Sequence, residues 1–519
     1  MKSKELIGQI IDFDYKGMGM TKLDDIPVFL DKGVIGDKVS YTITKDKKSF
    51  YKGRVTKILK KSKDRVESPC KYFNKCGGCD FLNYKYEKSL DWKKQSVNNK
   101  LQRISELDIK VSKVNSSEKT FNYRNNMQFQ VKNGKIGLYM KNSKEIVPIE
   151  HCLMQSTNAN KTLKILTKFK NLEKIKTLGI RTNYKDQVML IISSKEKINK
   201  LNLILGNLID ANVVSIYENI NNRTNAHYGD EFNLLYGQEY LEEKINKLYY
   251  KLSPASFFQV NREQAENLYN KAMEFLQVKE NEKIADLYSG VGTLSLEIAS
   301  RKAQTLGVEI VEEAIEDARI NAQKNKLQAR FICGKSEEIL EKIQKDEKIK
   351  MDKILVDPPR KGMDKKLVDY LNKNSYEKIV YISCNPATLA RDLKILKEKY
   401  KVEKVEIFDL FFYTSHVETV ALLSKLDVDK HINIEIELDE LDLTSAESKA
   451  TYAQIKEYVW NKFELKVPTL YIAQIKRKCG IELREHYNKS KKEKQIIPQC
   501  TPEKEEAIMD ALRHFKMIE

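Results

Sequence analysis

Two residues in the C-terminal half of the chain could work together as a nucleophile and a base. Cys384 ends an apolar run in "KIVYISCNP", and the Asn-Pro after it turns the chain sharply and holds the thiol out of the predicted sheet. Glu418, in "HVETV", stands where another apolar run begins. A thiolate can activate a substrate by covalent addition and a carboxylate can remove a proton, so the chain offers one residue for each role. The plainer alternative for Cys384 is a buried structural thiol, because cysteine is among the most buried residue types.

A second group of residues has the spacing of metal ligands. "CKYFNKCGGCD" places Cys70, Cys76 and Cys79 at spacings x5 and x2, and Cys152 follows far downstream in "IEHCLMQ". Closely spaced thiolates in a reducing compartment indicate a metal or an iron–sulfur cluster, and the spacing alone does not choose between zinc and iron. The remaining cysteines have no partner by spacing and are expected to fill structural positions: Cys333, Cys479 and Cys500.

A third group predicts a cofactor pocket. In "IADLYSGVGT" an apolar strand leads into Gly290 and Gly292, which let the backbone approach a ligand closely. The next strand ends in Glu309, which could accept hydrogen bonds from both hydroxyls of a ribose, although it could instead only start a helix. Asp357 ends a later strand in "VDPPR" beside the same pocket. This arrangement resembles the class I S-adenosylmethionine-dependent methyltransferases.

These residues need a scaffold that brings several strand ends together. From about residue 265 to 426, apolar strand candidates alternate with helical stretches such as "EEAIEDARINAQKNK". Such alternation predicts an α/β domain with a doubly wound, mostly parallel sheet. Because the carboxyl ends of parallel strands meet at one edge, we expect Glu309, Asp357 and Cys384 to face one pocket.

The regions on either side have different patterns. Residues 1–62 contain short alternating runs with glycine turns, which predict a compact β-barrel, and the last hairpin interleaves Phe50 and Tyr51 with lysines. Cations that follow phosphates and rings that stack on bases suit an oligonucleotide-binding barrel, although a solvated hairpin would look similar. Residues 63–264 predict an α+β domain. Residues 427–519 contain two short helix candidates that could bind nucleic acid or serve as a packing appendage.

The composition limits the choice of partner. The chain has 519 residues, a net charge of +18 and 41% hydrophobic residues, so it has enough apolar material for several domains. The positive charge favours a polyanion partner, although a lysine-rich proteome would give a similar excess. The sequence has neither a membrane-spanning apolar run nor a signal peptide, so we expect a cytoplasmic protein without a membrane partner.

Six separated motifs resemble, in order, those of the RNA uracil-5-methyltransferases: "SPASFFQVN", "DLYSGVGT", "GVEI", "DPPRKG", "SCNPATLARDL" and "HVETVALL". The resemblance covers roughly residues 1–426. It implies that Cys384 adds to carbon 6 of a uracil and that Glu418 removes the proton from carbon 5. It also implies four contacts to S-adenosylmethionine: Gln259, Tyr288, Glu309 and Asp357. The chain departs from the family at Thr293, where several members have asparagine, and at Ser289, where many have cysteine.

The same resemblance bears on the cysteines and on the choice of RNA. The family carries the Cys-x5-Cys-x2-Cys spacing and a distant fourth cysteine as ligands of a 4Fe–4S cluster, which implies Cys70, Cys76, Cys79 and Cys152 here, in a structural or RNA-positioning role. The N-terminal barrel resembles the TRAM domain, found on members that act on 23S ribosomal RNA, whereas members that act on transfer RNA typically lack both features. Arg124 is expected to contact RNA, with an ordinary strand-edge arginine as the alternative.

The predicted architecture is therefore α/β, with a class I S-adenosylmethionine-dependent methyltransferase (Rossmann-like) domain at 265–426. An OB-like TRAM barrel at 1–62 and an α+β iron–sulfur domain at 63–264 precede it, and a small helical appendage at 427–519 follows. We expect a monomeric enzyme that methylates carbon 5 of a uridine in 23S ribosomal RNA.

Three alternatives stay open: methylation of a uridine in transfer RNA, methylation of an exocyclic base nitrogen, and an RNA-binding or assembly protein on the same fold. The nitrogen-methylating enzymes need an aromatic ring where Arg360 stands, and they need no cysteine.

Overall fold

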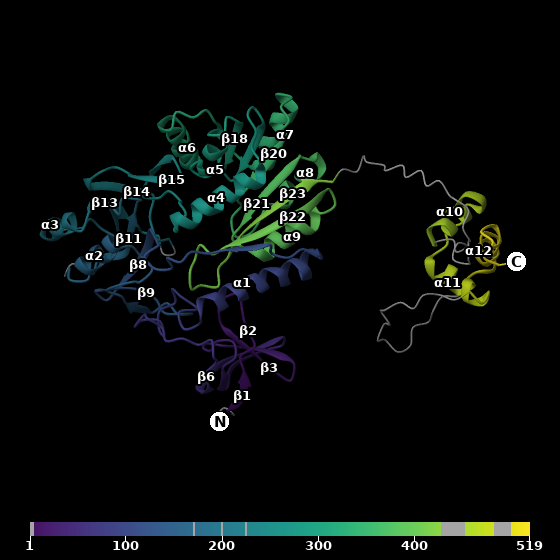
Figure 1. The fold of residues 1–519 in the computed structure, drawn as a ribbon, viewed down its shortest axis with the longest axis horizontal. Coiled ribbons are helices and arrows are strands. Elements are labelled where there is room, and N and C mark those ends of the chain that lie inside the picture. The colour runs from purple at the N-terminus through teal and green to yellow at the C-terminus, as the bar shows by residue number, and fades with distance from the viewer. Residues whose placement is uncertain are drawn as a thin grey trace. The chain divides into compact units, whose positions relative to one another are not determined.

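A computed structural model describes residues 5–169, 172–198, 201–223, 226–426, 452–481 and 500–518. The chain divides into two compact units, residues 1–428 and residues 429–519 (Figure 1). Residues 427–451 and 482–499 of the predicted appendage lie outside the described residues. None of the described helices combines the length and the apolar character that a membrane crossing requires.

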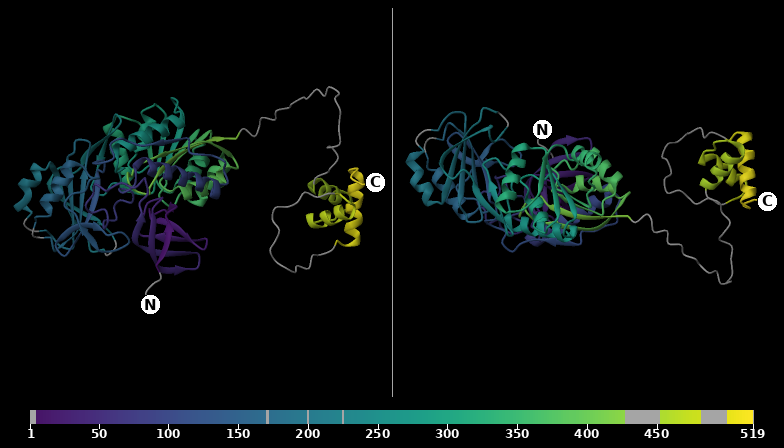
Figure 2. Two further views of the ribbon diagram at one scale, coloured as in Figure 1. Left: turned by 60° about the horizontal axis from the view of Figure 1, so that its bottom comes forward. Right: turned by 90° about the horizontal axis from the view of Figure 1, so that it is seen from above.

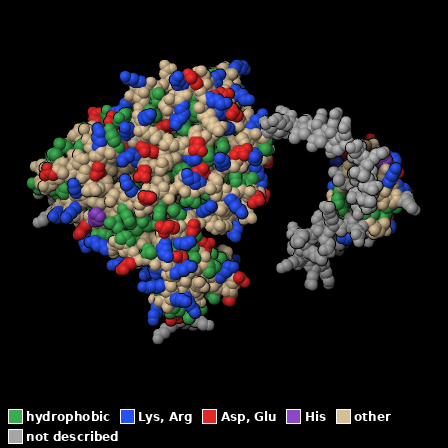
Figure 3. Space-filling model, in the orientation of Figure 1, with side chains coloured by type: hydrophobic (Ala, Val, Ile, Leu, Met, Phe, Trp, Pro, Cys, Tyr) green, Lys and Arg blue, Asp and Glu red, His purple; other side chains and the backbone are tan. Residues whose placement is uncertain are grey.

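The N-terminal segment forms a six-stranded sheet. Its strands are β1 (Leu6–Gln9), β2 (Asp12–Phe13), β3 (Gly19–Leu23), β4 (Ile26–Leu30), β5 (Lys38–Lys47) and β6 (Phe50–Lys60), in the order β1-β5-β6-β4-β3-β2. Alternate residues such as Val28, Leu30 and Tyr41 are buried together, as the alternating pattern predicts. Lysine and arginine side chains are exposed along β5 and β6, and Figure 3 shows cations over this lobe.

A seven-stranded sheet follows. Its strands are β8 (Asn126–Lys132), β9 (Lys135–Tyr139), β10 (Ile146–Pro148), β11 (Ile175–Thr182), β12 (Val188–Ser194), β13 (Val213–Ile220) and β14 (Glu231–Gly237), in the order β10-β9-β8-β11-β12-β13-β14. The helices α2 (Thr157–Leu166) and α3 (Asn202–Asp210) pack against it. A separate hairpin of β15 (Leu241–Ile245) and β16 (Leu248–Leu252) leads towards the next sheet.

The predicted methyltransferase region forms most of an eight-stranded sheet. Its strands are β17 (Lys283–Leu287), β18 (Gln304–Glu309), β19 (Arg330–Cys333), β20 (Lys353–Val356), β21 (Lys378–Ser383), β22 (Tyr400–Phe408), β23 (Glu418–Lys425) and β7 (Lys113–Asn115), in the order β19-β18-β17-β20-β21-β23-β22-β7. The strands from β19 to β21 are parallel, and β23 runs antiparallel to β21. The edge strand β7 comes from the predicted central domain, and no sequence motif signals this pairing.

Helices cover both faces of this sheet. They are α1 (Tyr86–Lys100), α4 (Arg262–Leu276), α5 (Thr293–Ala299), α6 (Glu312–Lys324), α7 (Ser336–Asp346), α8 (Lys365–Asn374) and α9 (Pro386–Leu396). Val380 and Ile382 pack with α4 to α6, whereas Ile379 and Tyr381 pack with α1, α8 and α9. Figure 1 shows this layering, and the left view of Figure 2 agrees with it. Burial on both faces explains why β21 has a continuous apolar sequence.

The α1 helix ends in a short π-helical turn, Leu101–Ser105, that packs beside α9. Together with β7, this turn attaches the segment around residues 86–115 to the eight-stranded sheet. The C-terminal unit contains α10 (Tyr452–Phe463), α11 (Thr469–Lys478) and α12 (Pro502–His514) around its own apolar core. The helix pair predicted there is present, with Pro468 capping α11 and Gly480 following it at a φ of +74°.

Candidate active site

The nucleophile candidate and the base candidate lie at adjoining strand ends. Ser383, the last residue of β21, pairs with Thr419 of the antiparallel strand β23, and the Thr419 hydroxyl donates to the Ser383 carbonyl at 2.9 Å. Cys384 follows Ser383, and Glu418 precedes Thr419. The antiparallel direction of β23 therefore brings the start of this strand to the edge at which the parallel strands end.

The Asn-Pro after Cys384 starts a helix. Asn385 caps α9 by accepting a hydrogen bond from the Ala387 N–H at 3.1 Å, and Pro386 occupies the first turn. The Asn385 side chain also donates to the Arg360 carbonyl at 3.0 Å. This contact joins the turn that carries the thiol to the Asp-Pro-Pro-Arg turn of the neighbouring strand.

The charges around Cys384 oppose one another. The pKa of this half-buried thiol is raised to about 11, chiefly by burial and then by the nearby carboxylates of Glu418 and Asp357, whereas Arg360 acts to lower it. Burial, with Asp357 adding to it, also raises the pKa of Glu418 well above its usual value, and Arg360 again acts in the opposite sense. Glu418 is only 5% exposed. The arrangement therefore joins a thiol, two carboxyl groups and one guanidinium at a single edge.

The guanidinium of Arg360 faces His416, two residues before Glu418. Its nearest approach to the imidazole ring is 3.4 Å, and burial followed by the charge of Arg360 lowers the pKa of His416. Tyr269 reaches the same region from α4, where burial raises the pKa of its hydroxyl and the charge of Asp357 adds to the effect. Helical periodicity places Tyr269 on the buried face of α4, but no short motif separates it from the core residues of that face, so the sequence does not reveal its place at the site.

The predicted cofactor residues surround the glycine turn after β17. Tyr288 has a φ of +67°, a left-handed conformation that is uncommon for a tyrosine, and its N–H donates to Val308 at 2.9 Å. The Glu309 carboxylate accepts from the N–H groups of Ile310 at 2.8 Å and Gly290 at 3.1 Å. Glu309 thus ends β18 and faces the glycine turn, whereas the next helix, α6, begins only at Glu312.

Two carboxylates lie next to this turn, Asp286 fully buried and Asp357 partly buried. Asp286, the second-to-last residue of β17, accepts from the Ser295 hydroxyl at 2.5 Å, and burial raises its pKa to about 7. Burial alone raises the pKa of Asp357 to about 7. The sequence places acidic residues at these strand ends, but their burial and proton affinity emerge only from the packed structure.

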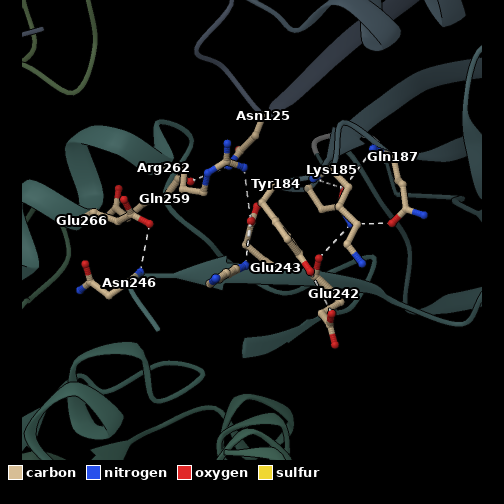
Figure 4. Close-up of polar contacts among 12 residues, drawn as sticks. Asn125, Tyr184, Lys185, Gln187, Glu242, Glu243, Asn246, Gln259, Arg262 and Glu266 are labelled. Atoms are coloured by element: carbon tan, nitrogen blue, oxygen red, sulfur yellow. Dashed lines mark hydrogen bonds and ion pairs between the residues drawn. The ribbon is translucent and has the colours of Figure 1, made fainter. Parts of the chain in front are cut away.

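Gln259 lies on the loop before α4, and residues outside the eight-stranded sheet hold this loop by hydrogen bonds. The Asn125 side chain donates to the Gln259 carbonyl at 3.0 Å, and the Asn125 N–H donates to Val260 at 2.9 Å (Figure 4). The buried guanidinium of Arg181 donates to the carbonyls of Ser253, at 2.6 Å, and Ser256, at 2.6 Å. Both anchors come from the seven-stranded sheet and its approaches.

A separate hydrogen-bonded group lies beside this loop. Glu243 of β15 faces Arg262, the first residue of α4, across 3.5 Å, and burial raises the pKa of Glu243 to about 7 (Figure 4). This pair fixes the start of α4 and therefore the end of the Gln259 loop.

The four cysteines predicted as ligands line one cavity. These are Cys70, Cys76, Cys79 and Cys152. Tyr123, Arg124 and His151 are among the other residues that line the cavity. Burial raises the pKa of Cys76 to about 11, and the neighbouring thiols add to this effect. Within the described ranges, no three His, Cys, Asp or Glu side chains converge closely enough to hold one metal ion.

Arg124 lies at a junction rather than on a free edge. Its N–H donates to Met154 at 2.8 Å, and its backbone bridges to Gln155 and to Asn261, the capping residue of α4. A contact from Arg124 to RNA stays a prediction.

Comparisons with known proteins agree with this geometry. The family described as tRNA (uracil-5-)-methyltransferase matches residues 85–426. An uncharacterized RNA methyltransferase of Clostridium tetani is 38% identical over 440 residues, which cover 79% of this chain and 94% of the relative. An uncharacterized RNA methyltransferase of Staphylococcus aureus, SAS1819, is 38% identical over 444 residues, covering 80% and 97%.

A solved structure is also similar to this chain. It is the Pyrococcus abyssi tRNA (uracil-54, C5)-methyltransferase in complex with S-adenosyl-L-homocysteine, with a TM-score of 0.67 and 29% identity. The match covers 80% of this chain and 100% of that chain.

Proposed function

The chain belongs to the tRNA (uracil-5-)-methyltransferase family of S-adenosylmethionine-dependent RNA methyltransferases, and from this premise we propose that it methylates carbon 5 of a uridine in RNA. In this proposal Cys384 is the nucleophile and Glu418 is the base. The observation that carries it is the position of these two residues at adjoining ends of β21 and β23, beside Asp357 and Arg360.

The reaction needs both residues in sequence. Carbon 5 of uracil is a poor nucleophile, and addition of the Cys384 sulfur to carbon 6 converts the ring into an enolate with an electron-rich carbon 5. That carbon takes the methyl group, and Glu418 then removes the proton from carbon 5. The released electron pair restores the double bond and expels the Cys384 thiolate. The target base must leave its stack to reach a half-buried thiol.

The charges at the site suit these steps. The raised pKa of Cys384 keeps the resting thiol protonated at neutral pH, and Arg360 favours its ionised form. A carboxylate with a raised pKa is a stronger base towards a carbon acid than an exposed one, which suits Glu418. When bound, S-adenosylmethionine supplies the methyl group and a positive charge at sulfur.

The glycine turn fits a polar ligand. Asp286 Oδ1 and Ser289 Oγ, both at this turn, are among several buried side-chain atoms of the described residues that have no hydrogen-bond partner. Buried polar atoms in this state cost free energy, so unpaired atoms beside a ligand-binding turn point to a bound group. We assign the donor's contacts to this edge, as the sequence predicts: Gln259, Tyr288, Glu309 and Asp357.

The cysteine cavity fits a cluster that joins two distant segments. Cys70, Cys76 and Cys79 come from one segment and Cys152 from another, and all four thiols face the same space. A 4Fe–4S cluster takes four such thiolates and is larger than a single ion. Bound there, it would cross-link the segments and fix the position of residues 70–80. Anaerobic purification followed by iron and sulfide analysis tests this assignment, with Cys79→Ser expected to lose the cluster.

The choice of RNA is a separate part of the proposal. The six-stranded sheet with its exposed cations and the four cysteines support 23S ribosomal RNA, as the family resemblance implies. The similarity to an archaeal enzyme named for uracil-54 of tRNA favours transfer RNA as the second candidate. Methylation assays on unmodified transcripts of both RNAs distinguish the two.

The central experiment traps the covalent step. Purified protein and labelled donor are mixed with RNA in which 5-fluorouridine replaces uridine, and a denaturing gel is examined for a protein–RNA adduct. Fluorine at carbon 5 cannot leave as a proton, so the Cys384 bond should persist. We expect an adduct that disappears in Cys384→Ala. Intact RNA binding without any adduct would contradict the proposed nucleophile and favour methylation at nitrogen.

A further inference from the structure

The loop that leads to Glu418 is anchored by segments outside the methyltransferase sheet. This base loop comprises residues 409–417, between β22 and β23. At its start, Asp409 forms an ion pair with Lys93 of α1 at 2.7 Å, and both side chains are at most 2% exposed. Asp409 also accepts from the Tyr86 hydroxyl at 2.9 Å. The first half of the base loop is therefore fixed to α1.

The second half of the base loop is held by Asp80, the residue after Cys79. The backbone N–H groups of Asp80, at 2.7 Å, and Phe81, at 2.9 Å, both donate to the Tyr413 carbonyl. The Asp80 carboxylate in turn accepts from the Ser415 N–H at 3.0 Å. These bonds fasten the loop on both sides of Thr414, four residues before Glu418, and Tyr413 has a φ of +58°.

Asp80 also contacts two other segments. Its second carboxylate oxygen accepts from Lys141 at 2.8 Å, and its side chain is 13% exposed. Gly17 of the N-terminal segment lies so close that an added Cβ would be 2.6 Å from the Asp80 Cβ. The Ser415 hydroxyl donates to the Tyr15 carbonyl at 2.9 Å. The N-terminal turn at residues 15–17, the cysteine segment (residues 70–80) and the base loop thus meet around Asp80.

We propose that Asp80 is a positioning residue whose carboxylate holds Glu418 in place through its bond to the Ser415 N–H, while the backbone bonds to Tyr413 dock the two segments and are kept in side-chain variants. The inference rests on the proposed function and adds a role for the cysteine segment, which would serve the proton-removal step rather than the addition of Cys384. Cys384 is placed by β21 and α9, neither of which contacts Asp80 through a hydrogen bond in the described part of the chain. Loss of Asp80 should therefore slow the last step selectively.

The test compares Asp80→Ala, Asp80→Asn and Lys141→Met with the wild type on the RNA transcript that the wild type methylates. With ordinary uridine, Asp80→Ala should lower turnover by roughly 10- to 100-fold, the effect of a displaced catalytic group. An adduct that carries the labelled methyl group should accumulate on denaturing gels. With 5-fluorouridine, the rate of adduct formation should stay within about twofold of wild type, because trapping does not need proton removal.

The two other variants separate positioning from general stability. Asp80→Asn keeps an oxygen that can accept from Ser415 and should restore most of the turnover. Lys141→Met keeps the Asp80 carboxylate and removes only its other partner, so it should behave as wild type.

Three results would overturn the inference. They are wild-type turnover in Asp80→Ala, equal slowing of turnover and of 5-fluorouridine trapping, and an Asp80→Asn variant as slow as Asp80→Ala. Absence of trapping in the wild type would instead overturn the proposed function, so the two failures are distinguishable.

Discussion

The candidate active site has two halves that are held in different ways. Glu309 ends β18, and Asp357 and Cys384 directly follow β20 and β21, so the register of the eight-stranded sheet places all three. Gln259 lies in a loop, and Glu418 opens β23 directly after a loop; the anchors of both loops come from other parts of the chain. We call these the sheet half and the loop half of the site.

The anchors of the loop half show what the central segment contributes. Asn125 and Arg181 hold the Gln259 loop, and Asp80 and Lys93 hold the base loop. All four residues precede the predicted methyltransferase domain. Changes in the central segment should therefore alter donor binding or proton removal, whereas the nucleophile should depend mainly on its own sheet.

The largest expected effect is the loss of turnover on substitution of Cys384 in the sheet half, compared with Glu418 in the loop half. Cys384→Ala should lower turnover by on the order of 10⁴-fold or more, because no other group can form the bond to carbon 6. Glu418→Gln should lower turnover by about 10²- to 10⁴-fold, the usual contribution of a general base, while a methylated adduct accumulates. Single-turnover assays with denaturing gels measure both effects. Accumulation of adduct in Cys384→Ala, or its absence in Glu418→Gln, would contradict the assigned order of steps.

The next effect concerns the stability of the base loop. Lys93→Met leaves Asp409 buried without its cation, which should lower the free energy of unfolding by about 3–5 kcal/mol. Adding Asp409→Asn removes the unpaired charge and should recover part of that loss. Chemical denaturation of the wild type, Lys93→Met and the double variant measures the difference. Equal stability of Lys93→Met and the wild type would show that α1 does not anchor the loop.

A smaller effect is expected on the cofactor side of the loop half. Asn125→Ala removes one hydrogen bond to the Gln259 carbonyl and should weaken S-adenosylmethionine binding by about three- to tenfold. Asn246→Gly is the control, since it removes side-chain bonds to Glu297 and Asn270, suits the φ of +51° at this position and keeps the backbone bond to Glu266 (Figure 4). Calorimetric titration with the donor measures both. Equal weakening by the two variants would assign the effect to general loosening of this region.

The same division explains how much the sequence predicts. Strand ends are visible as apolar runs that stop at Glu309, Asp357 or Cys384, so the α/β sheet and the sheet half of the site follow from local pattern. The Asn-Pro after Cys384 predicts a sharp turn, which the structure has, whereas its role as a helix start follows only from the capping geometry of Asn385.

The loop half was only partly predictable. Motif resemblance identifies Gln259 and Glu418, but their anchors are single polar residues whose partners lie far away in sequence, such as Asp80 with Ser415. No periodicity marks such a contact, and the pairing of β7 with β22 escapes the sequence for the same reason. The TRAM-like, iron–sulfur and ribosomal-RNA assignments rest on resemblance and remain predictions.

The smallest effect tests Arg360, a cation that acts on both halves. Arg360 lowers the pKa of Cys384 in the sheet half and of Glu418 in the loop half. Both groups work in their ionised forms and both have raised pKa values, so activity should rise as pH increases above neutrality. Arg360→Met raises both pKa values further and should move this rise to higher pH, with less than about tenfold lower turnover at neutral pH. Lys361→Met removes the same charge from the next, exposed position and should leave the profile unchanged. A pH–rate profile of Arg360→Met that matches the wild type would show that the two halves titrate without a shared cation.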